Sequence, residues 1–172
     1  MSVWSTPSRK GEVHRLPFAA ILVISFLAVS LQSYLPLHLS VVTILDLPLL
    51  VVIYFALARR SPVPALFGGA LIGMAQDSLT RGPIGLFGAV KTVIGYVTSA
   101  VSVHLDTEST GVRFLTIFFL YGLHFGLLYF LGAVLLSQPI EVGIQERLLG
   151  ALVNALVGVL LFKLLDRFRK TA

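Results

Sequence analysis

Long apolar runs separated by short polar breaks make up most of the chain. A helix needs about 20 mostly apolar residues to cross the ~30 Å hydrocarbon layer of a bilayer. The second run is the weakest, because Asp46 and Pro48 leave an uninterrupted apolar stretch of only Leu49 to Ala58. We expect a tilted or kinked helix there. The pattern predicts six spans, at 16–35, 41–58, 63–80, 84–103, 112–136 and 147–165.

Composition supports an all-α integral membrane protein. The 172 residues are 56% hydrophobic and 12% charged, and the mean hydropathy is +0.93, well outside the range of soluble domains. The absence of cysteine excludes disulfides, thiolate metal sites and cysteine nucleophiles. All loops are short, so we expect one six-span domain at 16–165 between a basic N-terminal arm (1–15) and a basic tail (166–172).

The net charge of +5 reflects membrane topology rather than nucleic-acid binding, because the basic residues cluster at the ends of apolar runs. If the N-terminus is cytoplasmic, the outer side carries only Arg81 and Arg147. This bias predicts that both termini are cytoplasmic, which six spans allow. The residues on the inner side would be Arg9, Lys10, Arg15, Arg59, Arg60, Arg113, Lys163, Arg167, Arg169 and Lys170.

Small residues at helical spacing predict close helix packing. Lipid provides no hydrophobic drive for helices to associate, so small residues and interhelical hydrogen bonds must hold them together. The third span carries Gly69, Gly73 and Asp77 at intervals of four residues. The sixth span repeats this spacing with Gly150, Asn154 and Gly158.

The third and fourth spans are predicted to form a tight antiparallel hairpin, because Gly82 and Pro83 end one helix and begin the next. Asp77 lies about one turn below this reversal. A charged side chain in the hydrocarbon region costs about 2.5–3.5 kcal/mol, so Asp77 needs partners.

Two interpretations of Asp77 remain open. In the first it is an interfacial residue that pairs with Arg81, four residues further along its own helix. In the second it forms a polar cluster with Gln76 and Lys91, joined by Asn154 or His124, which specifies packing or binds a ligand. His124 lies in the middle of the fifth span, where an interhelical hydrogen bond is a commoner role than proton transfer or metal binding. No metal-ligand spacing or hydrolase motif is present, so we expect no cofactor, no metal and no enzymatic activity.

One stretch resembles the signature region of the rod shape-determining protein MreD family: "LPLLVVIYFALARRSPVPALFGGALIGMAQDSLTRGPIGLFGAVKTVIGYVTSAV", Leu47 to Val101. The family pattern is a glycine-bearing span ending in an aspartate, a Pro-hydrophobic-Gly-Leu step and a helix ending in "GY". The chain departs from it in the second span, where "LDLPLL" replaces the usual Pro-Asp pair. The matching residues are Gly69, Gly73, Gln76, Asp77, Gly82, Pro83, Gly85, Leu86, Gly95 and Tyr96.

The resemblance implies a non-enzymatic scaffold subunit of the bacterial cell-elongation machinery, located in the cytoplasmic (inner) membrane. Such a subunit would bind the single-span protein MreC and, through it, MreB filaments, a glycan polymerase and a penicillin-binding transpeptidase. Arg59, Arg60 and His124 would then be candidates for contacts with partners or lipids.

The MreD fold is also similar to the six-helix substrate-binding subunits of energy-coupling-factor vitamin transporters, which gives the alternative of a small-molecule-binding subunit. That alternative expects an outer cavity lined by polar residues and an "AxxxA" face on the first span. The first span has Ala19, Ala20 and Ala28 but no alanine pair at that interval.

Overall fold

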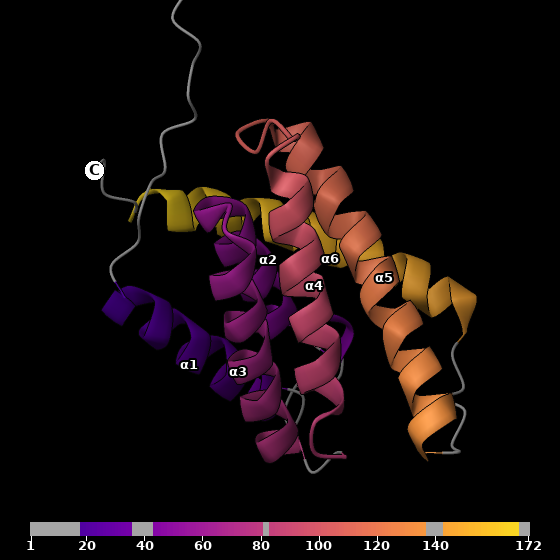
Figure 1. Ribbon diagram of the computed structural model, residues 1–172. Coiled ribbons are helices and arrows are strands. Elements are labelled where there is room, and N and C mark those ends of the chain that lie inside the picture. The colour runs from indigo at the N-terminus through magenta and orange to yellow at the C-terminus, as the bar shows by residue number, and fades with distance from the viewer. Residues whose placement is uncertain (1–17, 36–42, 81–82, 137–142, 169–172) are drawn as a thin grey trace, which may run out of the picture.

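The protein folds into α-helices joined by short connections. The computed structural model describes residues 18–35, 43–80, 83–136 and 143–168. Within these ranges it contains six helices and no strand, which confirms the expected all-α architecture (Figure 1). The helices are α1 (Phe18–Tyr34), α2 (Leu47–Arg59), α3 (Pro62–Thr80), α4 (Leu86–Ser102), α5 (Thr110–Leu136) and α6 (Ile144–Asp166).

Two helices in the described ranges are long and apolar enough to cross a membrane. They are Thr110–Val134 within α5 and Ile144–Asp166, which is α6. Three further apolar helices are shorter: Ala19–Tyr34, Leu47–Arg59 and Leu86–Ser102.

α2 is the central helix of the fold. It contacts each of the other five helices, and the side chains of Leu49, Leu50 and Ile53 have no exposed surface. A helix that is apolar on all sides is suited to such a position. α2 begins at Leu47 rather than at 41, the predicted start, because Asp46 caps it. Pro48 lies in the first turn, where its missing N–H group breaks no helical hydrogen bond, so the proline requires no kink.

α3 and α4 form the closest helix pair. They run side by side and are joined at the bottom of the view in Figure 1. A Cβ atom at Gly69 would overlap the carbonyl oxygen of Lys91, and one at Gly73 would overlap that of Phe87. Only glycine permits this backbone-to-backbone contact. α5 lies to the right in the same view, and α6 passes behind the other helices and crosses their direction.

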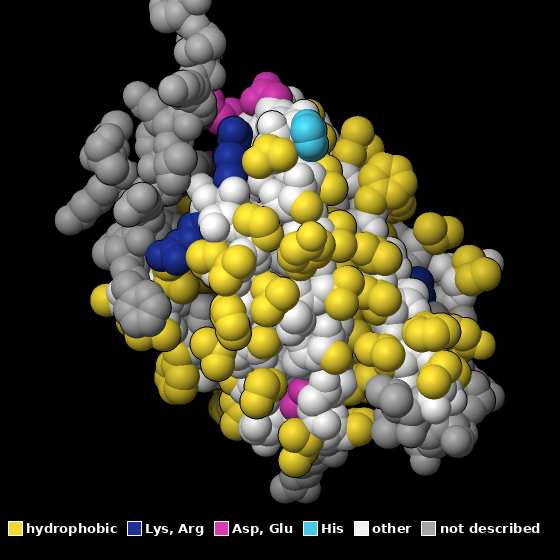
Figure 2. Space-filling model, viewed as in Figure 1, with side chains coloured by type: hydrophobic (Ala, Val, Ile, Leu, Met, Phe, Trp, Pro, Cys, Tyr) yellow, Lys and Arg dark blue, Asp and Glu magenta, His cyan; other side chains and the backbone are white. Residues whose placement is uncertain are grey.

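Large apolar side chains cover much of the outer surface. Every helix except α2 exposes several of them; for example, Phe26 is 71% exposed, Leu71 68% and Phe119 67%. Figure 2 shows one face, on which hydrophobic side chains occupy the middle while most charged side chains lie toward the top.

Charged and polar groups at one end of the molecule join four elements, and we refer to this region as the charged end. Arg60 at the end of α2 donates a hydrogen bond from Nη2 to Thr107 Oγ1 (3.0 Å) in the α4–α5 connection. Arg113 of α5 donates from Nε to the Thr107 carbonyl (2.6 Å) and pairs through Nη1 with Asp166 Oδ2 (2.7 Å) of α6. The Tyr54 hydroxyl of α2 donates to the other oxygen of Asp166 (3.1 Å).

Candidate functional site

Four buried polar side chains from four elements meet inside the protein and form what we call the buried ion cluster. Asp46 precedes α2, Lys91 lies in α4, His124 in α5 and Asn154 in α6. Asp46 is 7% exposed, and the other three have no exposed surface. Burying ions is costly unless they are paired and hydrogen-bonded, so the partners within this cluster decide what it can do.

Lys91 and Asp46 form a direct ion pair. The Lys91 ammonium group donates to both carboxylate oxygens of Asp46, with Nζ–Oδ1 and Nζ–Oδ2 distances of 3.1 and 2.9 Å. The ammonium also lies 5.2 Å from the centre of the Phe87 ring, a cation–π contact. The ion pair links the start of α2 to α4, and its two residues are 45 positions apart in the sequence.

Asp46 also caps α2. Its Oδ1 atom accepts a hydrogen bond from the backbone N–H of Leu49 (2.9 Å), the usual N-cap interaction that satisfies one free donor of the first helical turn. The carboxylate therefore has two roles, one in starting the central helix and one in neutralising the buried lysine.

Asn154 fixes the segment that leads into α2. Its Oδ1 atom accepts from the backbone N–H of Asp46 (2.9 Å), while its Nδ2 group donates to the carbonyls of Ile44 and Gly150, each at 2.8 Å. The carbonyl of Ile44 also accepts a 3.4 Å hydrogen bond from the hydroxyl of Tyr121. α6 therefore holds the start of α2 through backbone groups.

His124 completes the cluster without a well-aligned hydrogen bond. Its Nε2 atom lies 3.2 Å from Asp46 Oδ2, but neither ring nitrogen has a hydrogen-bond partner of good geometry in the described part of the chain. The ring stacks on Phe87 at 6.2 Å between centroids and meets Phe125 edge-on at 5.3 Å. His124 is fully buried and offers no exposed surface to a partner or a lipid in this arrangement.

Asp77 does not pair with Lys91. Its carboxylate instead accepts three backbone hydrogen bonds from the start of α4, each 3.0 Å long, from the N–H groups of Gly85, Phe87 and Gly88. A carboxylate at a helix N-terminus satisfies free donors and interacts favourably with the helix dipole. Gly85 has φ of +97°, a conformation that glycine adopts readily. Asp77 is therefore the residue that closes the α3–α4 hairpin.

Replacing Asp77 by alanine is expected to lower the free energy of unfolding by about 1–3 kcal/mol, because three N–H groups lose their acceptor. Asp77→Asn should cost less, since an amide oxygen still accepts. Equilibrium unfolding of the purified variants measures both changes. The control is Ser78→Ala, which removes an exposed hydroxyl that bonds only its own helix. Equal stabilities of Asp77→Ala and Ser78→Ala would contradict this role.

The remaining predicted positions are distributed over the fold. Gln76 is buried, and its Oε1 atom accepts no hydrogen bond from a described residue. Arg81 and Gly82 lie outside the described residues, so the pairing of Arg81 with Asp77 stays a prediction. Gly150 and Gly158 of α6 both face α5, where added Cβ atoms would meet Tyr121 and Ile117.

Sequence reasoning missed Asp46 as a functional residue and treated it only as an interruption of an apolar run. Two signals point to it. An aspartate just before a proline and an apolar run is a typical N-cap pattern. A lysine within an apolar helix also requires a carboxylate, and the sequence offers few.

These features define an all-helical protein built around an internal ion pair. Comparison of the chain with models of known families, with curated proteins and with solved structures found no match. In the described ranges no three histidine, aspartate or glutamate side chains are grouped to hold a metal ion.

Proposed function

We propose that all six helices are spans of a lipid bilayer, with α6 strongly tilted relative to the others. The support is the distribution of side chains: five helices turn large apolar groups outward, and α2, which does not, is enclosed by the others. Exposing such an apolar surface to water is unfavourable, whereas exposing it to lipid acyl chains is not. α5 and α6 are long enough to cross, and shorter helices can be accommodated when the bilayer thins locally.

The charged end is proposed to face the cytoplasm. It contains Arg60 and Arg113, which belong to the basic set that the positive-inside rule assigns to that side. Arg147, one of only two basic residues predicted outside, lies in the first turn of α6, whereas the charged end includes the last turn of that helix.

Within this class, we propose that the chain is an MreD-type protein. The support is that the residues carrying the resemblance have coherent roles in one unit. Gly69 and Gly73 bring α3 onto α4, Asp77 caps α4, and Gly85 adopts the turn conformation that precedes it. A signature made of packing residues is expected of a protein that acts through its shape.

The proposed activity is that of a non-enzymatic scaffold that binds MreC and helps to position lateral cell-wall synthesis. The observation that carries it is the buried ion cluster, in which Lys91 and Asn154 both bind Asp46. A transporter subunit would keep polar groups facing a cavity for its ligand. Here the buried ions neutralise each other, which suits a rigid platform.

Co-purification with MreC tests the proposal. The chain is tagged, co-expressed with the MreC of the same organism and isolated in mild detergent, with an unrelated single-span protein as the negative partner. We expect the tagged chain to retain MreC and not the unrelated single-span protein. Asp77→Asn should reduce the retained MreC, because it loosens the α3–α4 hairpin, whereas Ser78→Ala should not. Normal MreC retention by both variants, together with loss of a bound small molecule from Asp77→Asn, would favour the transporter alternative.

A further inference from the structure

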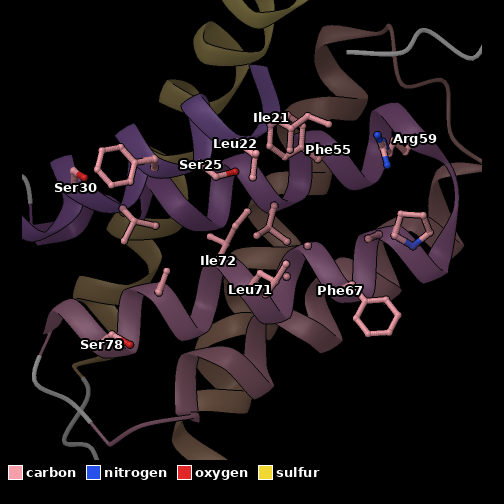
Figure 3. A pocket seen from close by; sticks show the side chains of 18 of the residues that line it. Ile21, Leu22, Ser25, Ser30, Phe55, Arg59, Phe67, Leu71, Ile72 and Ser78 are labelled. Atoms are coloured by element: carbon pink, nitrogen blue, oxygen red, sulfur yellow. The ribbon is translucent and has the colours of Figure 1, made fainter. Parts of the chain in front are cut away.

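An open groove lies between α1, α2 and α3 and has no part in the buried ion cluster. Its volume is about 650 Å³. Figure 3 shows its labelled side chains: Leu22 and Ser25 come from α1, Phe55 from α2, and Leu71 and Ile72 from α3. The lining is almost wholly apolar, and the groove opens to the outside of the helix bundle.

The groove is long and narrow. On α3 its lining extends from Pro64 to Leu79, and the fifteen helical rises of 1.5 Å between them give a length of about 22 Å. Volumes of 300–1,000 Å³ are typical of small-molecule sites. The length and volume of the groove therefore suit a lipid acyl chain.

A cationic side chain lies at one end of this apolar groove. Among the described residues that line the groove, Arg59 is the only charged one, and it lies at one end, where α2 finishes (Figure 3). Its neighbour Arg60 is held by Thr107, and Arg113 is held by Asp166. Arg59 forms no hydrogen bond or ion pair with any described residue. A guanidinium group matches the geometry of a phosphate, so this end is complementary to an anionic headgroup.

We propose that the groove binds an anionic phospholipid, with one acyl chain between α1 and α3 and the phosphate on Arg59. The site rests on the membrane placement proposed above, but not on MreC binding. The charged end is the interfacial end of the groove, which places a lipid phosphate at the level of Arg59 while its chain runs toward the middle of the bilayer.

Native mass spectrometry tests the site. The protein is reconstituted into vesicles of equal parts phosphatidylglycerol and phosphatidylcholine, extracted in mild detergent, and its bound lipid identified. We expect one retained phosphatidylglycerol. Arg59→Gln should weaken lipid binding about tenfold in Kd, the change that loss of a charged contact of 1.4 kcal/mol produces, and so lower the retained lipid. Arg167→Gln, at an exposed arginine away from the groove, should leave the occupancy unchanged.

Gly68→Leu tests the chain-binding part of the groove. Gly68 lines the groove, and a Cβ atom there meets nothing within 4 Å, so leucine fills the groove without disturbing the fold. Gly126→Leu is the matched control, because that glycine on α5 is equally open but lies elsewhere. We expect Gly68→Leu to lose the lipid and Gly126→Leu to keep it.

Three results would overturn the lipid site: equal retention of phosphatidylcholine, undiminished lipid on Gly68→Leu, or capture of a second copy or a protein helix by the groove. A chain that retains the lipid as expected but does not co-purify with MreC would leave this site intact and refute the scaffold function alone.

Discussion

Lys91→Met is expected to destabilise the protein by about 3–5 kcal/mol, because it leaves the carboxylate of Asp46 buried and without its cation. The cost arises from the uncompensated charge rather than from lost packing, since methionine is similar in size and apolar. Thermal or chemical unfolding of the purified protein in detergent measures the change.

Two further variants separate this explanation from a general loss of stability. Lys163→Met makes the same substitution at an exposed lysine of α6 and should have little effect. Combining Lys91→Met with Asp46→Asn removes both charges and keeps an N-cap acceptor for Leu49, so the double variant should regain part of the lost stability. If Lys91→Met and Lys163→Met proved equally stable, the ion pair would have no structural importance.

Gly69→Leu is expected to cost about 3 kcal/mol or more, because its side chain must enter the space occupied by the α4 backbone at Lys91. Backbone atoms cannot rotate away as a flexible side chain can. Gly68→Leu, one residue earlier, meets open space and should preserve or slightly raise stability, because leucine is the better helix former.

Unfolding of the two variants, followed through their helix content by circular dichroism, measures the difference in their stability. Opposite effects at adjacent positions would show that the distance between α3 and α4 is set by glycine. Similar effects of the two substitutions would show that the pair can separate without cost.

The positions of the helices could be predicted from the sequence, because apolar length and spacing are local properties. The limits of α3 and α5 lie within two residues of their predicted spans. The start of α2 was misplaced because Asp46 was treated as an interruption within a span from 41 rather than as the cap that begins the helix.

The internal arrangement could not be predicted in the same way. The fully apolar run of α2 was considered the weakest span, yet its lack of a polar face is the reason that the other helices surround it. Similarly, Lys91 had a carboxylate partner within reach in sequence, Asp77, but bonds one 45 residues away. Which side chains meet depends on the face that each helix turns inward, and this is a property of the whole packed chain.

The Asn154 bridge has a consequence for biosynthesis. The backbone N–H of Asp46 bonds the side chain of Asn154, which is 108 residues further along the chain. At ordinary rates of translation Asn154 is therefore synthesised about 5–20 s after Asp46. Until α6 emerges from the ribosome, the entry to the central helix lacks this clamp, and the nascent chain is most vulnerable to quality-control proteases. A stop codon before Asn154 should therefore yield a product that is degraded, even though the five earlier helices are complete.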